Sequence, residues 1–356
     1  MAGRERPELD EMVAKFMLSV TTLSSWLHTV GYYFYTDDQM RQAKPFSNPD
    51  YKVAPPLHNA SSLGFPKIVQ KMIDAGVDIN LTSHKYKTAL YVASVEGYAD
   101  VVKLLLTAGA DLDAKLDGNN TILQVVSKKG HADVMSLLLA AGADPNIQGG
   151  FYGTALQAAC YESRTDISKL LLEAGANVDL EGGYYSTALI AASLQTNASC
   201  IKLLASSGVK GCLDVVNGHC GTALQTAAGN VTAGATMIEI LLKAGAAIDK
   251  KGIEYSTPLH AAVLRENLDA IIVLIQAGAS LDIIHDEYGT ALDIAISRRN
   301  HTIIKILLQA GAHQTATIAN KSSPHAMLLH QMALEQALLK LQIQSEPSSM
   351  EDEQPQ

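Results

Sequence analysis

The sequence predicts an all-α repeat solenoid of about eight units, each a helix-turn-helix followed by a β-hairpin. Two marks recur along the 356 residues: a hexad resembling Thr-Ala-Leu-x-x-Ala, and a glycine about 21 residues after it. A period near 33 residues is typical of arrays in which each unit buries its apolar face against the next. The hexads begin at Pro55, Thr88, Thr121, Thr154, Thr187, Thr222, Thr257 and Thr290.

Each element of the unit has a local cause, which is clearest in residues 154–186. Thr154 stands at the N-cap of the first helix, and Gly175, just past the end of the second, supplies a left-handed C-cap. Residues 176–186 are rich in turn-formers and favour a projecting hairpin over a third helix. Small residues let the first helix approach its neighbours, and branched residues turn the second toward a core. The small residues are Ala155, Ala158 and Ala159, and the branched residues are Ile167, Leu170, Leu171 and Leu172.

The sixth repeat is irregular. The glycine that follows each second helix recurs every 33 residues, except that Gly245 of this repeat follows Gly208 by 37. Two residues are added before Thr222, in a hairpin, and two after it, in the turn between the helices. Both places are surface connections, where insertions cost little.

The hexads carry a resemblance to a known family. The hexad at Thr257 reads Thr-Pro-Leu-His-Ala-Ala, and the one at Pro55 reads Pro-Pro-Leu-His-Asn-Ala. They resemble the Thr-Pro-Leu-His-x-Ala hexad of ankyrin repeats, and the resemblance covers about residues 53–317. It implies that His58 and His260 hydrogen-bond the loop of the neighbouring repeat.

Other hexads depart from that pattern by carrying glutamine in place of the histidine, at Gln124, Gln157 and Gln225. A glutamine amide both donates and accepts hydrogen bonds. We therefore expect the bond between repeats to survive the replacement.

The hairpin before the fourth hexad adds a second resemblance. From Gly149 the chain reads Gly-Gly-Phe-Tyr-Gly-Thr-Ala-Leu, and a similar run begins at Gly182. This form resembles the ankyrin arrays of filamentous fungi, which often follow a NACHT-type nucleotide-binding module in signalling receptors. No such module occurs in the sequence, so the resemblance concerns the sensing array only. It implies a free-standing relative or a fragment of such a receptor.

The segments outside the repeats have patterns of their own. Residues 1–52 contain an amphipathic stretch, which predicts a helix that caps the first repeat or docks a partner. Residues 318–344 predict a capping helix opened by Ser323 and Pro324. Residues 345–356 predict a disordered acidic tail.

Composition narrows the function. A formal charge of -9 and a pI near 5.6 leave no basic stripe for phosphates, so no nucleic-acid partner is expected. No run of 18 apolar residues occurs and the start is charged, so neither membrane binding nor secretion is expected. Four cysteines do not make a disulfide framework. These features predict a monomeric cytoplasmic protein, with nuclear entry open.

Two segments of the sixth repeat resemble cofactor sites incompletely. The run from Gly229 has the spacing of a phosphate-binding loop, but Ala235 stands where the lysine is required. Cys212, His219 and Cys220 supply three ligands where structural zinc takes four. We therefore expect no catalytic residue, no cofactor and no metal. Cys160 stands where sister repeats carry serine, and is expected to be a packing residue.

The predicted function is a non-catalytic scaffold or adaptor that binds a protein partner on its concave face, formed by hairpin tips and first helices. Tyrosines recur two residues before the hexads, and residues seven and eight positions after each hexad start change character between repeats. The candidate partner-binding residues are Tyr86, Lys128, Tyr152, Tyr161, Tyr185, Leu194, Tyr255, Arg265 and Tyr288.

Alternatives remain open at this stage. The tyrosine column could be a structural feature that packs neighbouring hairpins together. The chain could be an accessory protein or enzyme of a fungal biosynthetic pathway, or the sensing fragment of a larger signalling receptor.

Overall fold

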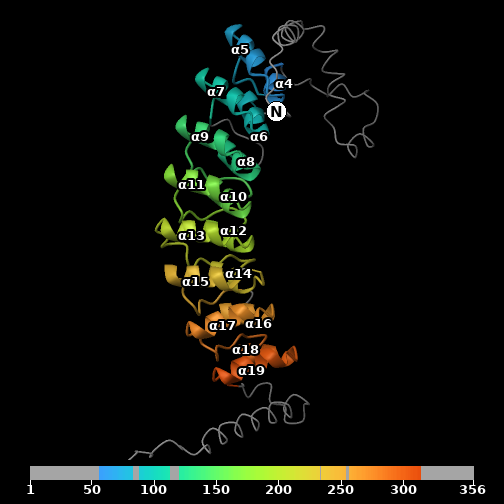
Figure 1. Cartoon of the computed structure of the whole chain (residues 1–356), viewed down its shortest axis with the longest axis vertical. Coiled ribbons are helices and arrows are strands. Elements are labelled where there is room, and N and C mark those ends of the chain that lie inside the picture. Colours follow the sequence, from blue (N-terminus) through green and yellow to red (C-terminus); the bar gives the residue numbers. More distant parts are fainter. Residues whose placement is uncertain (1–55, 83–87, 113–119, 233, 254–255, 314–356) are drawn as a thin grey trace, which may run out of the picture. The chain divides into compact units, whose positions relative to one another are not determined.

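The computed structural model describes residues 56–82, 88–112, 120–232, 234–253 and 256–313 (Figure 1). These residues form sixteen α-helices, and isolated bridges take the place of strands among them. The chain divides into two compact units, the first ending at Asn217 and the second beginning at Gly218. The predicted all-α repeat fold is confirmed. The terminal segments, 1–52 and 318–356, lie outside the described residues.

The first unit contains five helix pairs. They are α4 (Pro56–Ser62) with α5 (Pro66–Asp74), α6 (Ala89–Glu96) with α7 (Ala99–Thr107), α8 (Ile122–Lys129) with α9 (Ala132–Ala140), α10 (Ala155–Tyr161) with α11 (Thr165–Glu173), and α12 (Ala188–Leu194) with α13 (Ala198–Ser206). The second unit contains three pairs: α14 (Ala223–Ala228) with α15 (Gly234–Ala244), α16 (Pro258–Leu264) with α17 (Leu268–Gln276), and α18 (Ala291–Ser297) with α19 (His301–Gln309).

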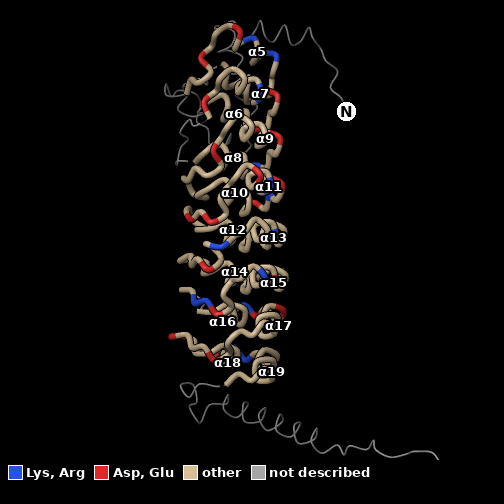
Figure 2. The backbone as a smooth tube through the Cα atoms, turned by 90° about the vertical axis from the view of Figure 1, so that its left-hand side faces the viewer, with Lys and Arg blue, Asp and Glu red and all other residues tan. Residues whose placement is uncertain are grey.

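Within each unit the helices form two rows (Figure 2). The first helices of successive repeats pack on one another, as α8, α10 and α12 do, and so do the second helices, as α9, α11 and α13 do. The segments after α9, α11 and α17 lead back to the starts of α10, α12 and α18 (Figure 1). Neither row could hide its apolar face in a single repeat, which is why the pairs stack.

The hexads explain both the start of the first helix and its core. The hydroxyl of Thr154 accepts a hydrogen bond from the backbone N–H of Gln157 at 3.2 Å, so the predicted N-cap is confirmed. The third residue of each hexad is a leucine that is at most 2% exposed, and each such burial stabilises the fold by about 2 kcal/mol. These leucines are Leu57, Leu90, Leu123, Leu156, Leu189, Leu224, Leu259 and Leu292.

The second helix follows its prediction with one difference. Ile167 and Leu171 are buried, but Leu170 and Leu172 are half-buried because they flank the stripe that faces the neighbouring repeats. Gly175 has φ of +88°, the left-handed conformation expected of a helix C-terminus. Cys160 is buried, with its Sγ 3.7 Å from the Ser168 hydroxyl, as expected of a packing residue.

Tight hairpins follow the second helices. Single antiparallel bridges join Gly149 to Gly153, Gly182 to Ser186 and His285 to Gly289, so each hairpin ends in a loop of three residues. The projecting hairpins predicted from the turn-formers are confirmed at these three places. Three residues remain between α12 and α13, but five, 229–233, lie between α14 and α15, where an insertion was predicted.

The bond predicted between a hexad and the following hairpin is confirmed for His260, and three glutamines make it too. The Nε2 of Gln124 donates to the carbonyl of Gly153 at 2.7 Å, and that of Gln157 to the carbonyl of Ser186 at 2.7 Å. In the second unit, Gln225 donates to the carbonyl of Ser256, and Nε2 of His260 lies 3.1 Å from the carbonyl of Gly289. Each of these four side chains therefore holds the closing residue of the next hairpin.

His260, the buried histidine that bonds the Gly289 hairpin, makes the second unit sensitive to acid. Burial holds the pKa of His260 below its usual 6.5, because the charged imidazolium is poorly solvated there. The unfolded chain then binds the proton more tightly, so stability present above the unfolded pKa is lost as pH falls through 6.5 toward the folded pKa.

We expect His260→Gln to reduce this acid sensitivity, since Gln225 makes equivalent bonds in the preceding repeat. Urea unfolding of wild type and variant at about pH 7.5 and about pH 5.5 measures the effect. The variant should lose less stability between the two conditions. An equal loss in both proteins would show that other groups cause the acid sensitivity.

Candidate partner-binding surface

The structure brings together four of the predicted site residues in the first unit: Lys128, Tyr152, Tyr161 and Tyr185. Leu194 is half-buried at the end of α12. Arg265 and Tyr288 belong to the second unit and are exposed. Tyr86 and Tyr255 lie outside the described residues.

The hairpins of the fourth and fifth repeats build this site by stacking on each other. The backbone N–H of Tyr184 donates to the carbonyl of Phe151 at 2.8 Å, which joins the two tips directly. The side chain of Gln148 donates to the carbonyl of Glu181 at 2.9 Å. On the other side, the amide of Asn217 donates to the carbonyl of Tyr184 at 2.9 Å. The backbone of the tip at Tyr184 is therefore held by hydrogen bonds on both sides.

This close approach depends on glycine. Gly183 has φ of +63°, and a Cβ built on it would lie 2.4 Å from the backbone nitrogen of Gly153 and the carbonyl carbon of Tyr152. No side chain fits there without moving one hairpin away from the other. Gly183 is thus a packing requirement as well as a turn signal.

Five rings from these hairpins and from α10 form one aromatic cluster, consisting of Phe151, Tyr152, Tyr161, Tyr184 and Tyr185. The rings of Phe151 and Tyr184 stack at 5.1 Å with an interplanar angle of 15°. Those of Tyr161 and Tyr185 stack at 4.2 Å and 19°. Edge-to-face contacts at 5.6 and 5.2 Å join Tyr185 to the first two rings. These are the geometries that aromatic pairs favour.

The two stacked pairs differ in exposure. Phe151 and Tyr184 are 52% and 47% exposed, whereas Tyr185 is 5% exposed. Successive residues of the tip thus point outward and inward, so that the inner pair supports the outer pair. The tyrosine column predicted Tyr185 as a partner-binding residue but did not predict Phe151 or Tyr184. The adjacent aromatics of each tip, Phe151 beside Tyr152 and Tyr184 beside Tyr185, were the sequence signal for them.

Charged groups border the aromatic cluster. The hydroxyl of Tyr152 donates to a carboxylate oxygen of Glu162 at 2.7 Å, and the amine of Lys128 lies 6.0 Å from the Tyr152 ring centroid. Burial and then the hydrogen bond to Glu162 raise the pKa of Tyr152, and burial raises that of Tyr185. Both phenols are therefore neutral at physiological pH and contribute apolar area and hydrogen bonds.

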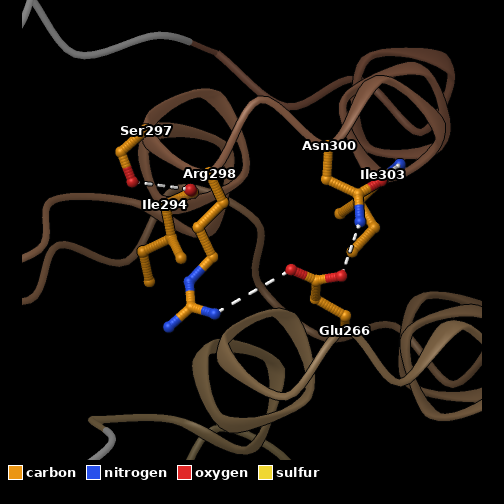
Figure 3. Close-up of polar contacts among 6 residues, drawn as sticks. All are labelled: Glu266, Ile294, Ser297, Arg298, Asn300 and Ile303. Atoms are coloured by element: carbon orange, nitrogen blue, oxygen red, sulfur yellow. Dashed lines mark hydrogen bonds and ion pairs between the residues drawn. The ribbon is translucent and has the colours of Figure 1, made fainter.

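The second unit presents its candidates differently. Tyr288 is 40% exposed and stacks on His285 at 4.9 Å, and the ring of His285 lies 6.3 Å from that of His260. Arg298, which belongs to the variable positions after the hexads, is engaged within the array (Figure 3). One of its guanidinium nitrogens lies 3.9 Å from a carboxylate oxygen of Glu266, whose other oxygen accepts a bond from Asn300 at 3.2 Å. These contacts join two turns of neighbouring repeats.

The segments that resembled cofactor sites have packing roles where they are described. Cys212 is buried, and its Sγ donates to the carbonyl of Val178 at 3.4 Å. The amide of Asn267 holds the turn after α14 by donating to the carbonyls of Ala228 and Asn230 at 3.1 and 2.7 Å. Across the described ranges, no three His, Cys, Asp or Glu residues are grouped so that they could hold a metal ion. None of the helices described is long and apolar enough to cross a bilayer.

Comparison with known proteins identifies the repeat. A family model described as ankyrin repeats (3 copies) matches residues 57–149, 123–215, 156–252 and 224–318. These overlapping matches span most of the 356 residues. A search of the curated proteins finds no match to the chain.

Proposed function

This chain belongs to the ankyrin-repeat family, and from that premise we propose that it is a non-catalytic scaffold or adaptor that binds a protein partner through the aromatic cluster of its first unit. Ankyrin repeats are generally protein–protein interaction modules. The proposal adds where the partner binds: on the outer rings of Phe151 and Tyr184, flanked by Lys128 and Glu162. We further propose that the protein acts in the cytoplasm or nucleus.

The observation that supports this proposal is the exposure of two large rings on a rigid support. Exposed aromatic area at a well-packed site is what dominates binding energy at protein interfaces. The tips are already fixed by the contacts of Gln148, Tyr184 and Asn217, so binding need not order them. Tyrosine adds contact area with few rotatable bonds, as binding loops exploit.

Replacing both outer rings tests the proposal. In Phe151→Ser/Tyr184→Ser the inner pair, Tyr161 and Tyr185, stays in place, and we expect partner affinity to fall by about 2 kcal/mol or more. Capture from the native cell extract, followed by a titration with the purified partner, measures the loss. Both proteins must first show the same melting temperature.

Tyr288→Ser serves as the control, because it removes an exposed tyrosine from a hairpin tip of the second unit. We expect it to bind the partner as wild type does. If the double variant retains full affinity, the outer rings are not the binding surface. If the control loses as much as the double variant, binding is spread along the column instead of being centred on the aromatic cluster.

A further inference from the structure

We propose that the segment bound by the aromatic cluster is basic and carries arginine, with a guanidinium lying on the exposed rings and a cation pairing with Glu162. This inference rests on the proposed function and specifies the chemistry of the partner. It is carried by the exposed aromatic area together with the charges that surround it.

The described parts of the first unit's hairpin segments carry more acidic than basic residues. Residues 77–82, 110–112, 143–153, 176–186 and 209–217 contain six acidic side chains and one basic side chain. The acidic ones are Asp78, Asp111, Asp144, Asp179, Glu181 and Asp214, and the basic one is Lys210. Figure 2 shows several of these acidic positions along the hairpins. A partner that approaches the tips therefore meets a negative potential, which favours and steers a basic segment.

Asp179 keeps its charge although it has a structural role. Burial alone would raise the pKa of Asp179, but backbone N–H groups of Gly211, Cys212 and Lys210 hold it below its usual value. Its structural role therefore leaves this part of the acidic field in place.

Glu162 supplies a more specific contact. It is half-buried at the end of α10, and one of its oxygens accepts the Tyr152 hydroxyl. No cation lies within ion-pair distance of its carboxylate in the part of the chain that the structure describes. A partner cation at this place would pair with a carboxylate that is already oriented by the aromatic cluster.

The rings themselves favour arginine. Lys128 already lies near one ring of the cluster, that of Tyr152, while Phe151 and Tyr184 are 52% and 47% exposed. A guanidinium stacks flat on such faces and also matches a carboxylate with two parallel N–H donors, whereas an ammonium does neither as well. The combination of exposed rings and an adjacent carboxylate thus favours arginine over lysine.

The test uses the full-length protein and a fluorescent peptide of repeated Gly-Ser-Arg, with Gly-Ser-Lys and Gly-Ser-Glu peptides of equal length for comparison. Glu162→Gln keeps an oxygen that accepts the Tyr152 hydroxyl but removes the charge. We expect this variant to lower the affinity for the arginine peptide by roughly fivefold. Glu96→Gln is the matched control. Glu96 is exposed and stands eight residues after the start of its hexad, as Glu162 does, and both variants change the net charge equally. It should change binding by less than about twofold.

Two results would overturn the inference: equal effects of Glu162→Gln and Glu96→Gln, or binding of the glutamate peptide as tight as that of the arginine peptide. Phe151→Ser/Tyr184→Ser gives a second readout, because it should also weaken the arginine peptide.

The captured partner separates the two proposals. If its binding is lost in the aromatic double variant but unchanged in Glu162→Gln and in competition with the arginine peptide, the inference fails and the proposed function stands. If the arginine peptide behaves as expected but the captured partner binds Phe151→Ser/Tyr184→Ser as tightly as wild type, the proposed function fails.

Discussion

Replacing Gly183 by alanine is expected to lower the free energy of unfolding by about 4 kcal/mol. The new methyl group would lie 2.4 Å from backbone atoms of the preceding hairpin, and backbone cannot move aside as a flexible side chain can. The positive φ adds the strain of a left-handed alanine. Urea unfolding followed by circular dichroism measures the loss.

Gly175→Ala separates the two contributions. Gly175 also has a positive φ, but a Cβ at this position meets no atom within 4 Å. We expect it to cost about 1.5 kcal/mol, from backbone strain alone. If the two variants are equally stable, the stacking of the hairpins does not depend on close approach at Gly183, and the rigid support proposed for the outer rings is absent.

Replacing Gln157 by alanine is expected to cost about 3 kcal/mol. Its buried amide donates to the carbonyls of Leu180 and Ser186, and its oxygen accepts the backbone N–H of Thr154. The variant would remove the side-chain bonds of the Thr154 N–H and the Leu180 carbonyl, which costs more than the net gain of one hydrogen bond.

Gln157→His should restore most of this stability, because His260 makes the corresponding contact with Gly289 in the second unit. Gln195→Ala, at an exposed position of the next repeat, is the control and should change stability by less than about 0.5 kcal/mol. Melting curves and urea unfolding of the three variants test this order. A Gln157→Ala variant as stable as Gln195→Ala would mean that the bond between repeats contributes little.

Most of the fold could be predicted because its causes are local and repeat along the chain. Thr154 caps the first helix through its own side chain, and Gly175 ends the second helix through its own backbone freedom. Gln157 stands where the resemblance places a histidine, and hydrogen-bonding chemistry alone indicates that it can replace it. Leu170 and Leu172 were harder to place, since helical spacing does not tell how wide the buried stripe is.

The aromatic cluster could be predicted only in part. A column of tyrosines can be recognised in the sequence, and it includes Tyr152 and Tyr185. Their orientation is set by the way one hairpin tip lies on the next, through the bond from Tyr184 to Phe151 and the approach at Gly183. That arrangement couples residues 33 positions apart, and composition at a single position does not encode it. The exposed rings are therefore those of Phe151 and Tyr184, which directly precede the column residues Tyr152 and Tyr185.

The bonds between repeats have a direction, and this direction matters while the chain is being made. In each case the hexad side chain comes earlier in the chain than the carbonyl it holds, which belongs to the hairpin before the next hexad. Since synthesis proceeds from the N-terminus, Gln157 emerges from the ribosome before Ser186 does. Each nascent hairpin thus meets a donor that is already in position. The outer rings, by contrast, are fully supported only once Asn217 has emerged, so a nascent chain shorter than this would not yet present its partner with the finished surface.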